Sequence, residues 1–221
     1  MTTAPTLTTP RLRLRAPAEV DIDPIVNACQ DPDIQRFTLV PVPYRRTDAE
    51  FFVHRLAVQD DARCWTIETL GDDGDAGAFV GIIGLHRPAE GGGGGSVDGG
   101  GSGDGDDVAG VGYWCVPEHR GRGYLGEALR AVVEDAFTPA ADGGAGLRLV
   151  FWSALVGNIA SARLACSAGF RYTGTKFEDF RDRDRGVAKV HTAELCADDD
   201  RTPQHWPVLD RESGPAKPDL A

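Results

Sequence analysis

An amphipathic helix pattern over residues 123–137 does most to limit the folds open to this 221-residue chain. Apolar side chains recur there at spacings of three and four, so one face of the helix must be buried. Strand-like runs at 108–116 and 147–154 stand on either side of the pattern. A helix between two such strands packs on the sheet that contains them. We therefore expect a sheet with at least one helix covering it.

Five other segments have the length and pattern of strands. They are residues 12–15, 64–70, 79–86, 171–177 and 187–196. Short turns join several of them, as they do antiparallel neighbours, whereas a helix separates others. The sequence therefore predicts an α/β fold with a mixed, mostly antiparallel sheet of six or seven strands flanked by helices.

Helix start signals indicate where the other helices begin. Asp23 and Asp31 each precede a proline, the arrangement of an N-cap followed by the first helical residue. Thr47 and Glu50 form a capping box, which opens another helix. A further helix is expected to begin at Asn158, which can cap it.

Two segments lack the pattern of a folded core. Residues 91–107 consist almost entirely of Gly, Ser and Asp, so we expect a disordered loop inserted within the domain. Residues 198–221 contain four prolines and no apolar periodicity, which predicts an extended tail held to the body by Trp206 and Val208. The expected organisation is a single domain over residues 1–197, followed by this tail.

Composition argues against several classes of protein. Asp+Glu number 34 against 23 Lys+Arg, and the resulting net charge of -11 disfavours nucleic acid as a partner and attracts cations. The chain has no apolar run of about 18 residues and no apolar leader, so we expect no membrane span and a cytoplasmic location. Its five cysteines and five histidines are scattered, a pattern typical of reduced thiols in a protein without a metal site.

The turn that opens the helix at 123–137 carries the strongest functional signal. It contains Arg120, Gly121, Arg122, Gly123 and Gly126. Unpaired N–H groups at a helix N-terminus bind anions, and glycines let the backbone approach a diphosphate with no Cβ in the way. The two arginines add positive charge. We expect an anion site here.

Two nucleotide-binding motifs fit this turn poorly. Glycines at 121, 123 and 126 have the spacing of a dinucleotide fingerprint, but no acidic residue follows the next strand to hold a ribose. A P-loop would require a lysine and a Ser or Thr where Glu127 and Ala128 stand. A nucleotide-dependent oxidoreductase is therefore a weak alternative.

Residues 112–129 resemble the acetyl-CoA signature of the GNAT superfamily of N-acetyltransferases. Residues 158–161, followed by 169–170, resemble the second landmark of that family in order and spacing. The opening over 9–15 resembles the branch that acetylates the N-terminal amine of ribosomal proteins. The resemblance extends over about residues 9–196 and is interrupted only by the glycine-rich segment.

This resemblance implies a site for acetyl-CoA. The diphosphate would lie on the glycine turn, and pantetheine would occupy a V-shaped splay between strands 108–116 and 147–154. The implied cofactor-binding residues are Cys115 and Val116 through their backbone, Arg120, Gly121, Arg122, Gly123, Tyr124, Leu125, Gly126, Asn158 and Ser161. Leu125 departs from the family motif, which has a small residue there, and Gly126 is expected to shift the register of the phosphate-binding amides.

Acetyl transfer to an amine needs a base for the amine and a proton for the leaving thiolate. Glu68 is the first candidate base because it is the only acid in its strand run, although a surface carboxylate fits the pattern equally well; His86 is a second candidate. Many relatives use a tyrosine in the helix after Asn158 as the acid, and this chain has none there. Ser161 or Tyr113 remains for that role, and Tyr113 could instead face the core.

The expected activity is acetyl-CoA-dependent N-acetylation of a primary amine, either a protein N-terminus or a small molecule, by a monomer or homodimer. We expect direct transfer, since a covalent route through Cys115 would need an activating base. The alternative, suggested by the missing tyrosine, is an acyl-CoA-binding module of the same fold without turnover. The acceptor is expected to depend on loops near 37–46 and 177–186.

Overall fold

The computed structural model describes residues 4–71, 76–87, 107–179 and 186–211. The predicted loop insertion at 91–107 lies outside these ranges except for Asp107.

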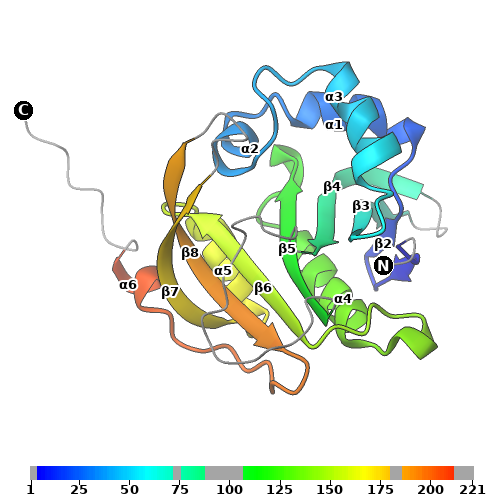
Figure 1. Ribbon diagram of the computed structural model, residues 1–221. Helices are drawn as coiled ribbons and strands as arrows, with labels where there is room; N and C mark the ends of the chain where they lie inside the picture. The colour runs from blue at the N-terminus through cyan, green and yellow to red at the C-terminus, as the bar shows by residue number, and fades with distance from the viewer. Residues whose placement is uncertain (1–3, 72–75, 88–106, 180–185, 212–221) are drawn as a thin grey trace, which may run out of the picture.

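The chain forms one eight-stranded sheet in the order β1-β2-β3-β4-β5-β6-β8-β7 (Figure 1). The strands are β1 (Leu7–Thr8), β2 (Leu12–Arg15), β3 (Ala62–Leu70), β4 (Ala76–His86), β5 (Val108–Cys115), β6 (Leu149–Leu155), β7 (Arg171–Asp179) and β8 (Val187–Cys196). All neighbours are antiparallel except β5 and β6, which confirms the mixed, mostly antiparallel sheet. The additional strand is β1, whose two residues are too few for an alternating pattern to reveal.

Helices cover both faces of the sheet. They are α1 (Ile22–Ala28), α2 (Pro32–Phe37), α3 (Arg46–Phe51), α4 (Tyr124–Phe137), α5 (Ile159–Ser167) and α6 (Pro207–Arg211). In Figure 1, α4 and α5 lie behind the sheet, and α1, α2 and α3 lie together at the top of the view. Ile83 belongs to the core beneath α4, whereas its neighbour Ile82 packs among α1 to α3, because successive strand residues face opposite sides.

Two of the four helix starts predicted from caps are correct. Asn158 caps α5 by accepting the N–H of Ser161 at 3.2 Å. Asp31 caps α2 by accepting the N–H of Ile34 at 3.0 Å. However, α1 begins at Ile22, ahead of Asp23, because a 3-10 turn over Glu19–Asp21 leads directly into it.

The capping box at Thr47 was also wrong. The helix α3 begins at Arg46, since Asp48 accepts the N–H of Arg45 at 2.7 Å and thereby satisfies an earlier donor.

The splay in the sheet lies between β5 and β6. The two parallel strands pair only through residues 108–110 and 149–151. Beyond this point β5 continues to Cys115 and β6 to Leu155 without pairing to each other. The expected V-shaped opening is therefore present, and a 3-10 turn over Pro117–His119 leads from the open end of β5 to the turn before α4.

The segment after β8 packs on the body through its aromatic residue. Trp206 is buried, contacts the rings of Trp152 and Tyr172, and donates its indole N–H to the Phe170 carbonyl at 3.1 Å. Val208 is buried too. Where an extended tail was expected, residues 207–211 form the short helix α6. Among the described residues, no helix is both long and apolar enough to cross a membrane.

Candidate functional site

The turn before α4 contains two glycines in the left-handed region. Gly121 and Gly123 have φ angles of 72° and 78°, which residues with a side chain rarely adopt. Gly123 is also the N-cap residue of α4. Within the part of the chain that the structure describes, the backbone N–H groups of residues 121–126 have no acceptor. Consecutive donors of this kind at the positive end of a 14-residue helix are an arrangement that generally favours anions.

The three glycines of the turn have different surroundings. A Cβ at Gly121 would meet nothing within 4 Å, and one at Gly123 would meet only the Arg11 Nη2 atom, at 3.5 Å. Gly126 is buried in α4, where a Cβ would lie 3.4 Å from Cδ1 of Leu164 on α5. The backbone is thus open to a ligand at 121 and 123, whereas Gly126 allows the two helices to approach.

The N-terminal strands hold this turn in place. Glu127, in the first turn of α4, accepts hydrogen bonds from the Thr9 hydroxyl at 2.5 Å, the Arg11 N–H at 3.0 Å and the Arg11 Nε at 2.7 Å. Burial raises the pKa of Glu127, but these hydrogen bonds outweigh it and leave the pKa below its usual value. Arg11 also donates to the Arg122 carbonyl at 3.1 Å and lies over the Tyr124 ring. The orientation of the loop therefore depends on the turn between β1 and β2.

A cavity of about 210 Å³ lies next to the turn, where α2, β5, α4 and α5 meet. Its walls are Asp33, Ile34, Phe37 and Thr38 from α2 and its end, Tyr113, Trp114 and Cys115 from β5, Arg120 and Leu125, and Asn158, Ala160, Ser161 and Leu164 from α5 and its cap. Six of the residues expected from the sequence to act on the cofactor or in catalysis line this one cavity. The lining is mostly apolar, with a few polar groups, as small-molecule sites usually are.

A chain of hydrogen bonds crosses one wall of the cavity. The Trp152 indole donates to the Ser161 hydroxyl at 3.0 Å, which donates to the Tyr113 hydroxyl at 3.1 Å, and this in turn donates to the Ser161 carbonyl at 3.2 Å. Asn158 fixes this end of α5 by accepting the Ser161 N–H at 3.2 Å. Burial raises the pKa of Tyr113 well above its usual value, so the phenol stays protonated.

The backbone groups of Cys115 and Val116, which were expected to bind pantetheine, already have hydrogen-bond partners within the protein. The Val116 N–H donates to the Val80 carbonyl at 2.9 Å, and the Cys115 carbonyl accepts from Arg120 Nε at 3.2 Å. Cys115 Sγ donates to the Val116 carbonyl at 3.4 Å. Burial raises the pKa of the Cys115 thiol to about 11, so it is an unactivated thiol at neutral pH.

The two arginines of the turn differ in their contacts. Arg120 forms ion pairs with Asp31 at 2.5 Å and with Asp33 at 3.2 Å, both at the start of α2. The side chain of Arg122 is exposed and has no ion pair among the described residues. The positive charge expected at the anion site is therefore partly neutralised at Arg120 and retained at Arg122.

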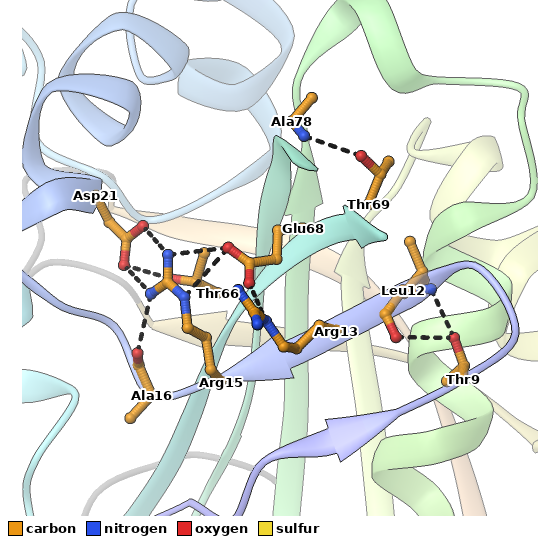
Figure 2. Close-up of polar contacts among 10 residues, drawn as sticks. All are labelled: Thr9, Leu12, Arg13, Arg15, Ala16, Asp21, Thr66, Glu68, Thr69 and Ala78. Atoms are coloured by element: carbon orange, nitrogen blue, oxygen red, sulfur yellow. Dashed lines mark hydrogen bonds and ion pairs between the residues drawn. The ribbon is translucent and has the colours of Figure 1, made fainter. Parts of the chain in front are cut away.

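Glu68 is buried, so its interpretation as a surface carboxylate is wrong. Figure 2 shows it between two arginines of β2: Arg13 donates to one carboxylate oxygen, and Arg15 contacts the other from Nε at 3.2 Å and Nη2 at 3.1 Å. Arg15 also forms a bidentate pair with Asp21, which accepts the Thr66 hydroxyl as well. This network joins β2, β3 and the turn before α1, and Glu68 does not line the cavity.

The second candidate base, His86, lies away from the cavity. His86 ends β4 in register with Gly110, at the opposite end of β5 from Cys115. In the described ranges, no group of three or more His, Cys, Asp or Glu side chains is placed to hold a metal ion.

The sequence did not reveal the contribution of α2 to the cavity. The cap at Asp31 predicted a helix, but nothing local indicated that Asp33, Ile34 and Phe37 would lie against the end of β5. Of the two loops expected to affect the acceptor, the one near 37–46 does contribute Phe37 and Thr38 to the wall.

Comparison with known proteins agrees with this geometry. The model of the acetyltransferase (GNAT) domain family matches residues 11–171, most of the described chain. A search of curated proteins found no match.

Three solved structures illustrate the shared fold. An acetyltransferase of the GNAT family from Bacillus anthracis has a TM-score of 0.67 at 16% identity, covering 88% of this chain and 100% of its own. RimL, a ribosomal L7/L12 alpha-N-protein acetyltransferase, has a TM-score of 0.63 at 15% identity, covering 87% of this chain and 94% of its own. Spermidine N-acetyltransferase from Vibrio cholerae, in complex with CoA and spermine, has a TM-score of 0.64 at 16% identity, covering 86% of this chain and 98% of its own. Because the family model spans well over half of the sequence, this chain belongs to the GNAT acetyltransferase family.

Proposed function

We propose that the protein transfers the acetyl group of acetyl-CoA to a primary amine, either the N-terminus of a protein or a small molecule. The observation that carries the proposal is the row of N–H groups over residues 121–126, for which the described residues provide no acceptor. We assign the diphosphate to these donors and to Arg122. Pantetheine would then enter the splay between β5 and β6, and the thioester would reach the cavity beside Tyr113 and Cys115.

In the proposed reaction the neutral amine attacks the thioester carbonyl, a C–N bond forms, and the C–S bond breaks. The CoA sulfur then needs a proton or a hydrogen-bond donor. Tyr113 is the proposed donor because it lines the cavity, stays protonated and is linked to Ser161. Ser161 donates a hydrogen bond to the Tyr113 oxygen and so stabilises the phenolate that is left, which regains its proton from solvent at the mouth of the cavity.

Direct transfer is favoured over an acyl-enzyme on Cys115. With a pKa of about 11, the thiol is ionised in on the order of one molecule in 10,000 at pH 7. We propose that Glu68 stabilises the β2–β3 region, because two guanidinium groups hold it and it lies outside the cavity lining. The proton of the acceptor then leaves through the open mouth of the cavity to solvent.

The net charge of -11 favours a cationic acceptor. Two neighbours in the fold comparison suggest acceptors to test, since their names refer to a protein N-terminus and to spermidine. The panel should contain spermidine, a tetrapeptide with a free N-terminal serine, and the same tetrapeptide with a blocked N-terminus as control.

Two measurements test the proposal. Acetyl-CoA at one hundred times its Kd should stabilise the protein by about 2.7 kcal/mol in thermal unfolding, whereas NAD and ATP should not. Thiol release should then require an amine from the panel. Binding without thiol release for any amine would favour the acyl-CoA-binding module, and absence of binding would refute the proposal.

A further inference from the structure

We infer that Arg120 is a positioning residue that fastens α2 to the glycine turn, and that it does not bind the cofactor diphosphate. This inference rests on the proposed function, because it concerns how the two halves of the proposed site are held together. In this inference Arg122 provides the positive charge that pairs with the diphosphate, and Arg120 holds the wall of the cavity in place.

All three nitrogens of the Arg120 guanidinium group have protein partners. Nε donates to the Cys115 carbonyl at 3.2 Å, Nη1 contacts Asp33 Oδ2 at 3.2 Å, and Nη2 contacts Asp31 Oδ1 at 2.5 Å. The side chain of Asp31 is only 15% exposed. To reach a diphosphate, Arg120 would have to leave two carboxylates behind, one of them largely buried, without a counter-charge.

The helix that Arg120 holds needs such a tie. With only six residues, α2 is too short to be stable by itself. Ile34 is its buried residue, while Phe37 and Thr38 line the cavity. Asp31 caps α2 and pairs with Arg120 through the same oxygen atom, so the cap and the tie converge on one carboxylate.

Arg122 has the opposite environment. Its side chain is exposed and without an ion pair in the described part of the chain, and Arg11 holds its carbonyl at 3.1 Å. It stands between Gly121 and Gly123, at the middle of the free N–H groups. Its guanidinium group can therefore meet a phosphate without leaving an ion pair to any described residue.

Arg120→Gln and Arg122→Gln are matched variants that separate the two roles. Isothermal titration with acetyl-CoA measures the affinity of the anion site, and amide hydrogen exchange of residues 33–38 measures how firmly α2 is held. Arg120→Gln should leave the Kd within about three-fold and speed exchange in α2 by about three- to ten-fold. Arg122→Gln should show the reverse, with weaker binding and unchanged exchange in α2.

A second variant removes the carboxylate partners of Arg120 and leaves the arginine in place. Asp31→Asn with Asp33→Asn keeps an N-cap residue and removes both negative charges. It should speed hydrogen exchange in α2 as Arg120→Gln does. Combining all three substitutions should give no faster exchange than either variant shows by itself. If Arg120 were a phosphate ligand, freeing it in this way would tighten acetyl-CoA binding.

The inference is overturned if Arg120→Gln weakens acetyl-CoA binding ten-fold or more with normal exchange in α2, or if the aspartate variant binds more tightly. For any amine of the panel that is acetylated, the loosened wall should raise KM by more than it lowers kcat in Arg120→Gln. If the unmodified protein binds no acetyl-CoA, the proposed function fails, whereas the exchange rates and their non-additivity still decide whether Arg120 holds α2.

Discussion

Single residues decide whether the turn before α4 can bind an anion, and Gly123 is the most sensitive of them. Its φ of 78° is costly for a β-branched residue, and a side chain at this position would project near the free N–H groups. We expect Gly123→Val to weaken acetyl-CoA binding at least about 30-fold, which corresponds to about 2 kcal/mol. Isothermal titration measures this change.

Gly143 offers a matched control for this substitution. Its φ is 89°, a Cβ there would meet nothing within 4 Å, and it lies in the turn after α4, away from the cavity. Gly143→Val should therefore carry a similar backbone strain and bind acetyl-CoA normally. Equal binding by both variants would mean that the glycine turn has no special part in the cofactor site.

Tyr113 is the residue on which the proposed chemistry depends. Replacing it with Phe keeps the ring and removes the hydroxyl that Ser161 contacts at 3.1 Å. We expect Tyr113→Phe to lower kcat about 100-fold, a usual loss for a general acid, with little change in acetyl-CoA affinity.

Tyr172→Phe is the control for this prediction, because Tyr172 also carries a hydrogen-bonded hydroxyl, to His191 at 3.0 Å, outside the cavity lining. A Tyr113→Phe variant with full kcat would remove Tyr113 from the mechanism and leave Ser161 or water as the proton source.

At the scale of elements, the contact between the β1–β2 turn and α4 should make stability depend on pH. The folded pKa of Glu127 lies below its usual value, so its stabilising effect is complete above the unfolded pKa of about 4.3 and is lost as the pH falls through the folded pKa. Glu127→Gln should lower the free energy of unfolding by about 1–2 kcal/mol at pH 7. Urea denaturation at several pH values measures the difference.

The difference between Glu127→Gln and the unmodified protein should shrink as the pH falls below the unfolded pKa of about 4.3, and it should disappear only below the lower folded pKa, where Glu127 is itself protonated in the folded protein. Glu134→Gln is the control on the same helix, since that side chain is 72% exposed and makes one contact, with Arg201. A constant difference at all pH values would show that the charge of Glu127 is not what holds the turn.

The network around Glu68 joins β2 to β3 and to the turn before α1. Because Glu68 is 4% exposed and has two arginine partners, Glu68→Gln should reduce the free energy of unfolding by about 2 kcal/mol. The pH dependence of turnover should stay unchanged. A variant that combines Glu68→Gln with Arg13→Gln should lose less free energy of unfolding than the sum of the losses of the two single variants. A large fall in kcat with an altered pH profile would instead identify Glu68 as the base.

At the scale of the whole molecule, the site exists because the sheet opens where four elements meet. Pairing between β5 and β6 stops after Gly110, and the walls of the cavity come from α2, β5, α4 and α5. Each face of the sheet has its own core. One lies beneath α4 and α5, and the other lies beneath α1 to α3. The inferred tie through Arg120 links the α2 side to the turn that opens α4.

Features that depend on near neighbours could be predicted from the amino-acid sequence alone. The apolar spacing of α4, the caps at Asp31 and Asn158 and the glycines of the turn could all be recognised, because each reflects contacts within about one helical turn. The family resemblance rests on the same local motifs. These features were sufficient to predict the fold class and to locate the turn on which we propose the anion site.

The partners of the charged residues, in contrast, could be identified only in the folded chain. Arg13 meets Glu68 across 55 positions of sequence, Arg120 meets Asp31 across 89, and Arg11 meets Glu127 across 116. No periodicity or capping rule reports on such pairs, because they depend on how strands and helices pack. For that reason Glu68 could be mistaken for a surface residue, and the place of α2 beside the cofactor turn emerged only from the folded chain.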